Sequence, residues 1–142
     1  MKPTHATIQV KNLRVRTYIG FNREERAKKQ DLVINMSICH RIEPDVLEDD
    51  VKSALNYKTI TKAVIERVEQ GRFLLLEKLV ADVVQICSSD ARVQHCSVTI
   101  DKPHALRFAD SVSVTLDYSA EALAMHHNRH PSHPLNLVGV AS

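Results

Sequence analysis

Four side chains of this sequence are of types that take part in acid–base chemistry or in the binding of polar rings: Glu25, Tyr57, Glu77 and Lys102. Glu77 falls in the first turn of an expected helix, where the helix dipole and free backbone N–H groups favour an ionised carboxylate. An ionised carboxylate beside exposed N–H donors can recognise a flat ring that offers two adjacent N–H groups. Taken alone, however, Glu77 is more often simply a favourable first-turn residue.

The other three residues are equally ambiguous one by one. Tyr57 opens an expected helix, where a phenol can reach outward, although most such tyrosines are packed aromatics with a wet hydroxyl. Lys102 follows a strand and precedes a proline, and a lysine there is usually a solvated charge. Glu25 belongs to a charged loop. Only the combination of these residues suggests a functional site.

The elements that must position them can be predicted from the hydrophobic periodicity. Alternating apolar residues predict strands at 7–18, 31–41, 93–101 and 111–119. In the first strand the alternation changes phase between Val10 and Leu13, which predicts a bulge near Asn12. Apolar residues three and four apart predict helices at 57–70 and 74–88. The charged segment 19–29, which begins near Gly20, is expected to be a loop.

The resulting order, ββααββ, predicts an α+β fold. Its core is a four-stranded antiparallel sheet with both helices on one face. Such a sheet leaves two long edges, which natural proteins rarely leave bare. Closure of several subunits into a barrel-forming ring would remove both edges.

Composition limits the class of protein. At 142 residues the chain fits one domain, expected at 1–120, and 44% hydrophobic with 25% charged residues is typical of a globular protein. The 19 basic and 17 acidic residues are interleaved, so nucleic acid is not an expected partner. No apolar run is long enough to span a membrane. Three cysteines without a CxxC pair, and no signal-peptide pattern, favour a cytoplasmic protein with reduced thiols.

The segment 121–142 shows neither helical nor strand periodicity, and we expect a flexible extension. It holds four of the eight histidines and two prolines. A zinc site there is disfavoured, because the prolines prevent a helical face and no cysteine or carboxylate completes a tetrahedral set.

Four short motifs lie in order on the expected elements. They are YIGFNREE at 18–25, DDVKSALNY at 49–57, LLLEKL at 74–79 and VTIDKP at 98–103. Together they resemble the dihydroneopterin aldolase family over nearly the whole expected domain, from about residue 8 to residue 118. The runs at 10–16 and at 104–112 are most similar to the family members that epimerise C2' of dihydroneopterin triphosphate.

The resemblance implies the tunnelling fold, in which two tetrameric rings stack into a homo-octamer with active sites at subunit interfaces. It implies that Glu77 anchors the pterin, assisted by backbone groups of Leu76 and, from a neighbouring subunit, of Leu55. It also implies three catalytic residues: Lys102, Tyr57 and Glu25.

The implied reaction is a retro-aldol cleavage of the side chain of a reduced pterin, followed by re-addition that inverts C2'. The dihydropterin ring itself accepts the electrons, so neither a Schiff base, a cofactor nor a metal is expected. Two alternatives stay open: an aldolase that releases 6-hydroxymethyl-7,8-dihydropterin and glycolaldehyde, and a catalytically idle pterin-binding ring. Arg107 is the preferred partner for a triphosphate, ahead of the other candidates Arg14, Arg16, Lys58 and Arg72.

Overall fold

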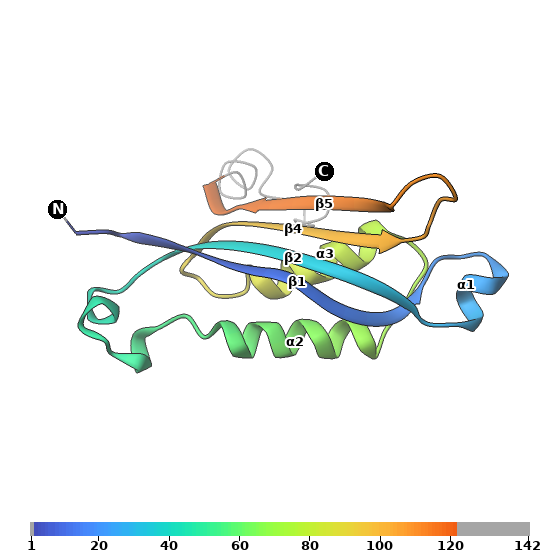
Figure 1. The fold of residues 1–142 in the computed structure, drawn as a ribbon. Coiled ribbons are helices and arrows are strands. Elements are labelled where there is room, and N and C mark those ends of the chain that lie inside the picture. The colour runs from blue at the N-terminus through green and yellow to red at the C-terminus, as the bar shows by residue number, and fades with distance from the viewer. Residues whose placement is uncertain (1, 122–142) are drawn as a thin grey trace, which may run out of the picture.

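A curved sheet carries helices α2 and α3 on one of its faces in the computed structural model, which describes residues 2–121 (Figure 1). The strand order is β3-β1-β2-β4-β5, and all neighbours are antiparallel except β3 and β1. The strands are β1 (His5–Ile19), β2 (Gln30–Arg41), β3 (Arg72–Phe73), β4 (Val93–Pro103) and β5 (Ser111–Ser119). The helices are α1 (Arg23–Ala27), α2 (Tyr57–Glu69), α3 (Leu76–Cys87) and two 3-10 turns, η1 (Pro44–Glu48) and η2 (Val51–Ser53).

The core lies between the sheet and the two long helices. Leu79, Val80 and Val83 of α3 are fully buried, as are Leu32, Ile34 and other inward-facing residues of β2 and β4. The fold class predicted from periodicity is confirmed. The same spacing that predicted the second helix is the stripe that α3 buries.

The predicted bulge in β1 is also present. The register of β1 against β2 shifts between Val10 and Leu13, and Asn12 has a left-handed φ of 55°. Its backbone N–H donates to Oδ1 of Asn35 on β2 at 2.9 Å. Asparagine tolerates this conformation better than most residues, which explains why the bulge lies there.

Two short elements correct the prediction. Residues 19–29 were expected to be a loop, but they contain α1, because Asn22 and Glu25 form a reciprocal capping box that starts a helix. The sheet has a fifth strand, β3, which pairs with Tyr18 and Ile19. α3 begins at Leu76 rather than at residue 74, because Leu75, its N-cap residue, is still extended with φ −118° and ψ 136°.

Long stretches of both sheet edges are open. β3 covers only the last two residues of β1, and among residues 2–121 no strand pairs with the outer edge of β5. In the same part of the chain, no helix is both long and apolar enough to cross a membrane.

Candidate active site

Lys102 and Glu25 meet, although 77 positions separate them in the sequence. Lys102 is near the end of β4 and Glu25 is in α1, and Lys102 Nζ donates a hydrogen bond to Glu25 Oε2. Both side chains are largely shielded from solvent, with 14% and 21% of their surfaces exposed. Two of the three predicted catalytic residues therefore form one ion pair.

Gly20 creates the space that the Glu25 carboxylate occupies. Its φ is +120°, a value that other residues rarely adopt, and a Cβ built on it would collide with the Glu25 carboxyl group. The capping box fixes the other side, since Glu25 N–H donates to Asn22 Oδ1 at 2.8 Å. The Asn-x-x-Glu spacing was visible in the sequence, but the contact with Gly20 was not.

The environment keeps Glu25 ionised. The hydrogen bond from Lys102 is the largest influence and lowers the pKa of Glu25 below its usual value of 4.5. Burial opposes this effect, while the backbone N–H of Asn22 and the charge of Lys102 add to it. At neutral pH, Glu25 is therefore an anion held next to an ammonium group.

The segment before α3 is linked to this pair through Gly20, which packs against the Glu25 carboxylate. Gly20 N–H donates to the Phe73 carbonyl at 2.9 Å, which ties the end of β1 to the segment that leads into α3. Leu75 occupies the N-cap position, and no side chain of the described residues caps this helix. Glu77 is exposed in the first turn, directly after the buried Leu76. A carboxylate and uncapped N–H donors are thus available together to a ligand.

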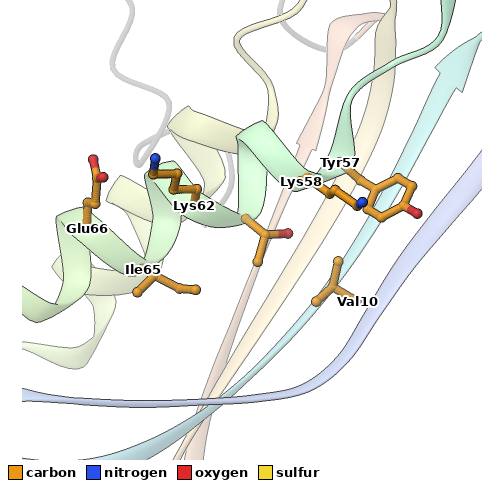
Figure 2. Close-up of a pocket in the computed structure, with 7 residues that line it drawn as sticks. Val10, Tyr57, Lys58, Lys62, Ile65 and Glu66 are labelled. Carbon is orange, nitrogen blue, oxygen red and sulfur yellow. The ribbon is translucent and has the colours of Figure 1, made fainter. Parts of the chain in front are cut away.

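Tyr57 and Leu55 lie elsewhere in the same chain. Figure 2 shows Tyr57 at the start of α2 beside Val10 of β1, where they line an apolar cavity of about 610 Å³. Val10 is nine positions before Ile19, the last residue of β1, and Gly20 follows directly; nine strand residues at about 3.3 Å each span roughly 30 Å. A single chain therefore does not bring Tyr57 or Leu55 to the Lys102–Glu25 pair.

Arg107 lies on the loop between β4 and β5. Its side chain is exposed, and its guanidinium carbon is 5.5 Å from the ring centre of Phe108, which is itself 95% exposed. The loop leaves β4 just after Lys102, so Arg107 is displayed on the same end of the sheet.

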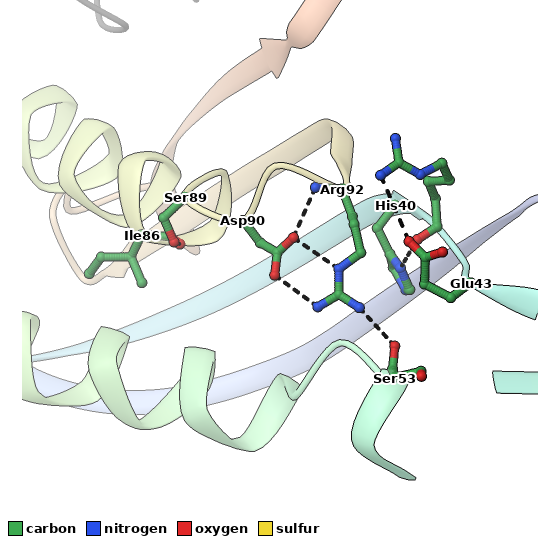
Figure 3. A network of polar contacts seen from close by, with 8 residues as sticks. His40, Glu43, Ser53, Ile86, Ser89, Asp90 and Arg92 are labelled. Carbon is green, nitrogen blue, oxygen red and sulfur yellow. Dashed lines mark hydrogen bonds and ion pairs between the residues drawn. The ribbon is translucent and has the colours of Figure 1, made fainter. Parts of the chain in front are cut away.

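A polar network that the sequence did not reveal holds the segment before α2 (Figure 3). Arg92 donates to Asp90 through Nε at 3.0 Å and Nη2 at 2.9 Å, and to the Ser53 carbonyl through Nη1 at 2.8 Å. These contacts lower the pKa of Asp90 to about 2, mainly through the Arg92 hydrogen bond. Through Arg92, the turn before β4 is hydrogen-bonded to Ser53, which lies just before Leu55 and Tyr57.

No three His, Cys, Asp or Glu side chains among residues 2–121 come close enough together to hold a metal ion. The tail histidines for which a zinc site was weighed lie outside the described residues: His126, His127, His130 and His133.

Comparisons with known proteins agree with the resemblance found in the motifs. The chain is 47% identical to dihydroneopterin triphosphate 2'-epimerase of Pseudomonas aeruginosa, over 82% of this chain and 94% of that protein. It is 49% identical to the Escherichia coli protein of the same name, over 80% and 94%. The fold matches E. coli dihydroneopterin aldolase in complex with neopterin, with a TM-score of 0.74 and 25% identity over 80% and 99% of the two chains.

A family model described as FolB, dihydroneopterin aldolase, matches residues 8–117, which include the Lys102–Glu25 pair, Glu77 and Tyr57. By sequence and by fold, this chain belongs to the dihydroneopterin aldolase family.

Proposed function

We propose that this protein is a dihydroneopterin triphosphate 2'-epimerase. The observation that carries the proposal is the partly buried Lys102–Glu25 ion pair, which Gly20 connects through Phe73 to the segment that leads into the uncapped, Glu77-bearing first turn of α3. The identity of 47–49% to two epimerases, over four fifths of the chain, favours this member of the family.

In this proposal Glu77 binds the amino-pyrimidinone part of the pterin. The carboxylate accepts hydrogen bonds from the ring N–H and exocyclic amino group, while a backbone N–H near Leu76 donates to the ring carbonyl. The dipole of α3 strengthens the arrangement, because its positive end faces the anionic side chain.

The reaction then needs only proton transfers. The Tyr57 oxygen receives the proton of the 2'-hydroxyl as its own phenolic proton passes to water, and the C1'–C2' bond breaks. The electron pair of that bond forms a double bond from C1' to the ring, and the ring C=N electrons move to the nitrogen, which gains a proton from water. The products are an enol-like hydroxymethyl pterin and an aldehyde that keeps the phosphates. Lys102 relays protons through water and stabilises charge on the ring, and Glu25 holds Lys102 in place. Re-addition to the other face of the aldehyde inverts C2', without a metal or a Schiff base.

The aldolase alternative uses the same intermediate. Its support is the shared family and the likeness to the E. coli aldolase crystallised with neopterin. If protonation of the enol outruns re-addition, 6-hydroxymethyl-7,8-dihydropterin and the aldehyde leave instead, and a barrier difference of about 1.4 kcal/mol changes the ratio tenfold.

Product analysis separates the two functions. Incubation with dihydroneopterin triphosphate should give mainly the threo epimer, dihydromonapterin triphosphate. Predominant release of the aldehyde fragment would establish the aldolase, and binding of pterin without turnover would establish the idle ring. Lys102→Ala should abolish turnover in either enzyme.

We further infer that the active enzyme is a cytoplasmic homo-octamer, with 121–142 as an extension outside the catalytic domain. The open edges of β1 and β5 support ring closure, since each could pair with a neighbour. Tyr57 lies beside the open part of β1, whereas Lys102 pairs in register with Val112 of the edge strand β5. Pairing β1 with a neighbour's β5 would therefore bring Tyr57 towards the neighbour's Lys102.

Arg107 is the proposed contact of the loop after β4 with the triphosphate. Arg107→Ala should raise the KM for dihydroneopterin triphosphate about tenfold, because a charge-assisted contact is lost, and should leave the KM for dihydroneopterin unchanged. Steady-state kinetics with both substrates test this prediction. Equal effects on both would exclude Arg107 as a phosphate contact.

A further inference from the structure

Arg26 and Arg72 line one cavity next to the Lys102–Glu25 pair. The cavity has a volume of about 340 Å³, and its other walls are Tyr18, Gly20, Phe73 and Leu74. No acidic residue is among these lining residues, so the cavity is cationic. Gly20 connects it to the candidate active site, because the same glycine packs against the Glu25 carboxylate.

Both arginines lack a carboxylate partner. Neither forms an ion pair with any residue of 2–121, whereas Arg16, Arg41, Arg67 and Arg92 each pair with an aspartate or a glutamate. Two cations gathered without compensation repel one another unless an anion from outside binds between them. Other described arginines, such as Arg23, also lack an ion pair, so what distinguishes this site is that two unpaired arginines line the same cavity.

Tyr18 holds Arg72 in a defined position. The Arg72 guanidinium carbon is 3.8 Å from the centre of the Tyr18 ring, a stacked arrangement that leaves the N–H groups at the edge free to donate. One of them, Nη1, donates weakly to the Arg26 carbonyl at 3.4 Å. Lys29 adds a further positive charge, with Nζ 5.9 Å from the same ring.

We propose that this Arg26–Arg72 cavity binds the terminal phosphates of the substrate and so selects the triphosphate over the free pterin. The inference rests on the proposed epimerase function and adds the residues that would set its substrate preference. Arginine suits the role, since its planar fork donates two parallel hydrogen bonds to phosphate oxygens.

The test compares Arg72→Gln and Arg26→Gln with Arg23→Gln as a matched control. Arg23 is also exposed in α1 and unpaired among the described residues, but it does not line the cavity. Each cavity variant should raise the KM for dihydroneopterin triphosphate about tenfold to a hundredfold, with kcat and the KM for dihydroneopterin unchanged. Arg23→Gln should change none of these constants.

Inorganic tripolyphosphate provides a readout that does not depend on pterin turnover. Calorimetry on the 142-residue chain should detect binding to the wild type and to Arg23→Gln, and a binding constant at least about tenfold weaker in Arg72→Gln. Cavity variants that behave like Arg23→Gln, or that affect both pterins equally, would overturn the proposal. If the wild type turns over no pterin yet loses tripolyphosphate affinity in Arg72→Gln, the epimerase assignment fails while the anion site stands.

Discussion

Gly20 shows how a missing methyl group can decide the position of a charged side chain. A Cβ at this position would overlap the Glu25 carboxyl group, and its φ of +120° is unfavourable for alanine. We predict that Gly20→Ala lowers the free energy of unfolding by about 1–3 kcal/mol and reduces kcat by displacing Glu25 from Lys102. Urea unfolding and steady-state kinetics measure the two effects.

The neighbouring carboxylate is the control for this prediction. Glu24→Gln removes an equal charge one position away, from an exposed side chain, and should leave both stability and kcat near the wild-type values. If Gly20→Ala retains the wild-type kcat, the position of Glu25 does not matter for the reaction.

For single residues, the sequence motifs identified candidate side chains, whereas their contacts with one another became visible only in the structure. Lys102 and Glu25 could be named from the resemblance, but their contact depends on β4 and α1 meeting in three dimensions. The role of Arg72 depends on the pairing of β3 with Tyr18 and Ile19, which no local pattern in the sequence indicated.

At the scale of elements, Arg92 connects the turn before β4 to the segment before α2. We predict that Arg92→Met lowers the free energy of unfolding by about 1.5–3 kcal/mol at pH 7, because charge-assisted hydrogen bonds to Asp90 and the Ser53 carbonyl are lost. It should also lower kcat, since Tyr57 follows four residues after Ser53. Arg16→Met is the control: its pair with Asp31 is largely exposed, so the loss should be about 0–1 kcal/mol.

The stability that the Arg92–Asp90 contact contributes should depend on pH. Asp90 has a pKa of about 2 in the folded protein, below its ordinary value of 3.8. Protonation therefore favours the unfolded state, so the contribution is complete above about pH 4 and is lost as the pH falls towards 2. The difference in unfolding free energy between wild type and Arg92→Met should be constant from pH 5 to 8 and shrink below pH 4. A difference that persists unchanged to pH 2 would contradict the role of Asp90.

Long elements were predictable because they repeat a pattern many times. The stripe of α2 and the alternation of β2 and β5 located these elements to within a residue or two at each end. By contrast, α1 has five residues and β3 has two. Both owe their conformation to single contacts, the Asn22–Glu25 capping box and the pairing with β1, and periodicity cannot detect elements of that length.

At the scale of the whole molecule, the separation of Tyr57 from Lys102 predicts a shared active site. If each site combines the two residues from neighbouring chains, a mixed assembly of Tyr57→Phe and Lys102→Ala chains contains some sites with both residues intact. Random mixing at equal amounts should restore about a quarter of the wild-type activity, whereas each variant alone is inactive. Co-expression with two affinity tags, followed by activity assays, measures the recovery.

No recovery in verified mixed assemblies would show that the two residues do not act across an interface. The sequence suggested a shared site in two ways: the family resemblance implied active sites at subunit interfaces, and the periodicity predicted a sheet with two open edges. Which faces meet could not be inferred from it, because subunit contacts depend on shape and not on periodicity.

The uncapped start of α3 has a consequence for stability. A side-chain cap on the first N–H donors of a helix typically stabilises it by about 1 kcal/mol, and α3 lacks such a cap. A pterin bound at Glu77 would accept a hydrogen bond from one of these donors and so replace the missing cap. Bound substrate would thus stabilise the folded state, and binding should raise the melting temperature whether or not the substrate reacts. Dihydroneopterin should therefore protect the wild type and Lys102→Ala against heat, but not Glu77→Ala, and calorimetric scans would detect the difference.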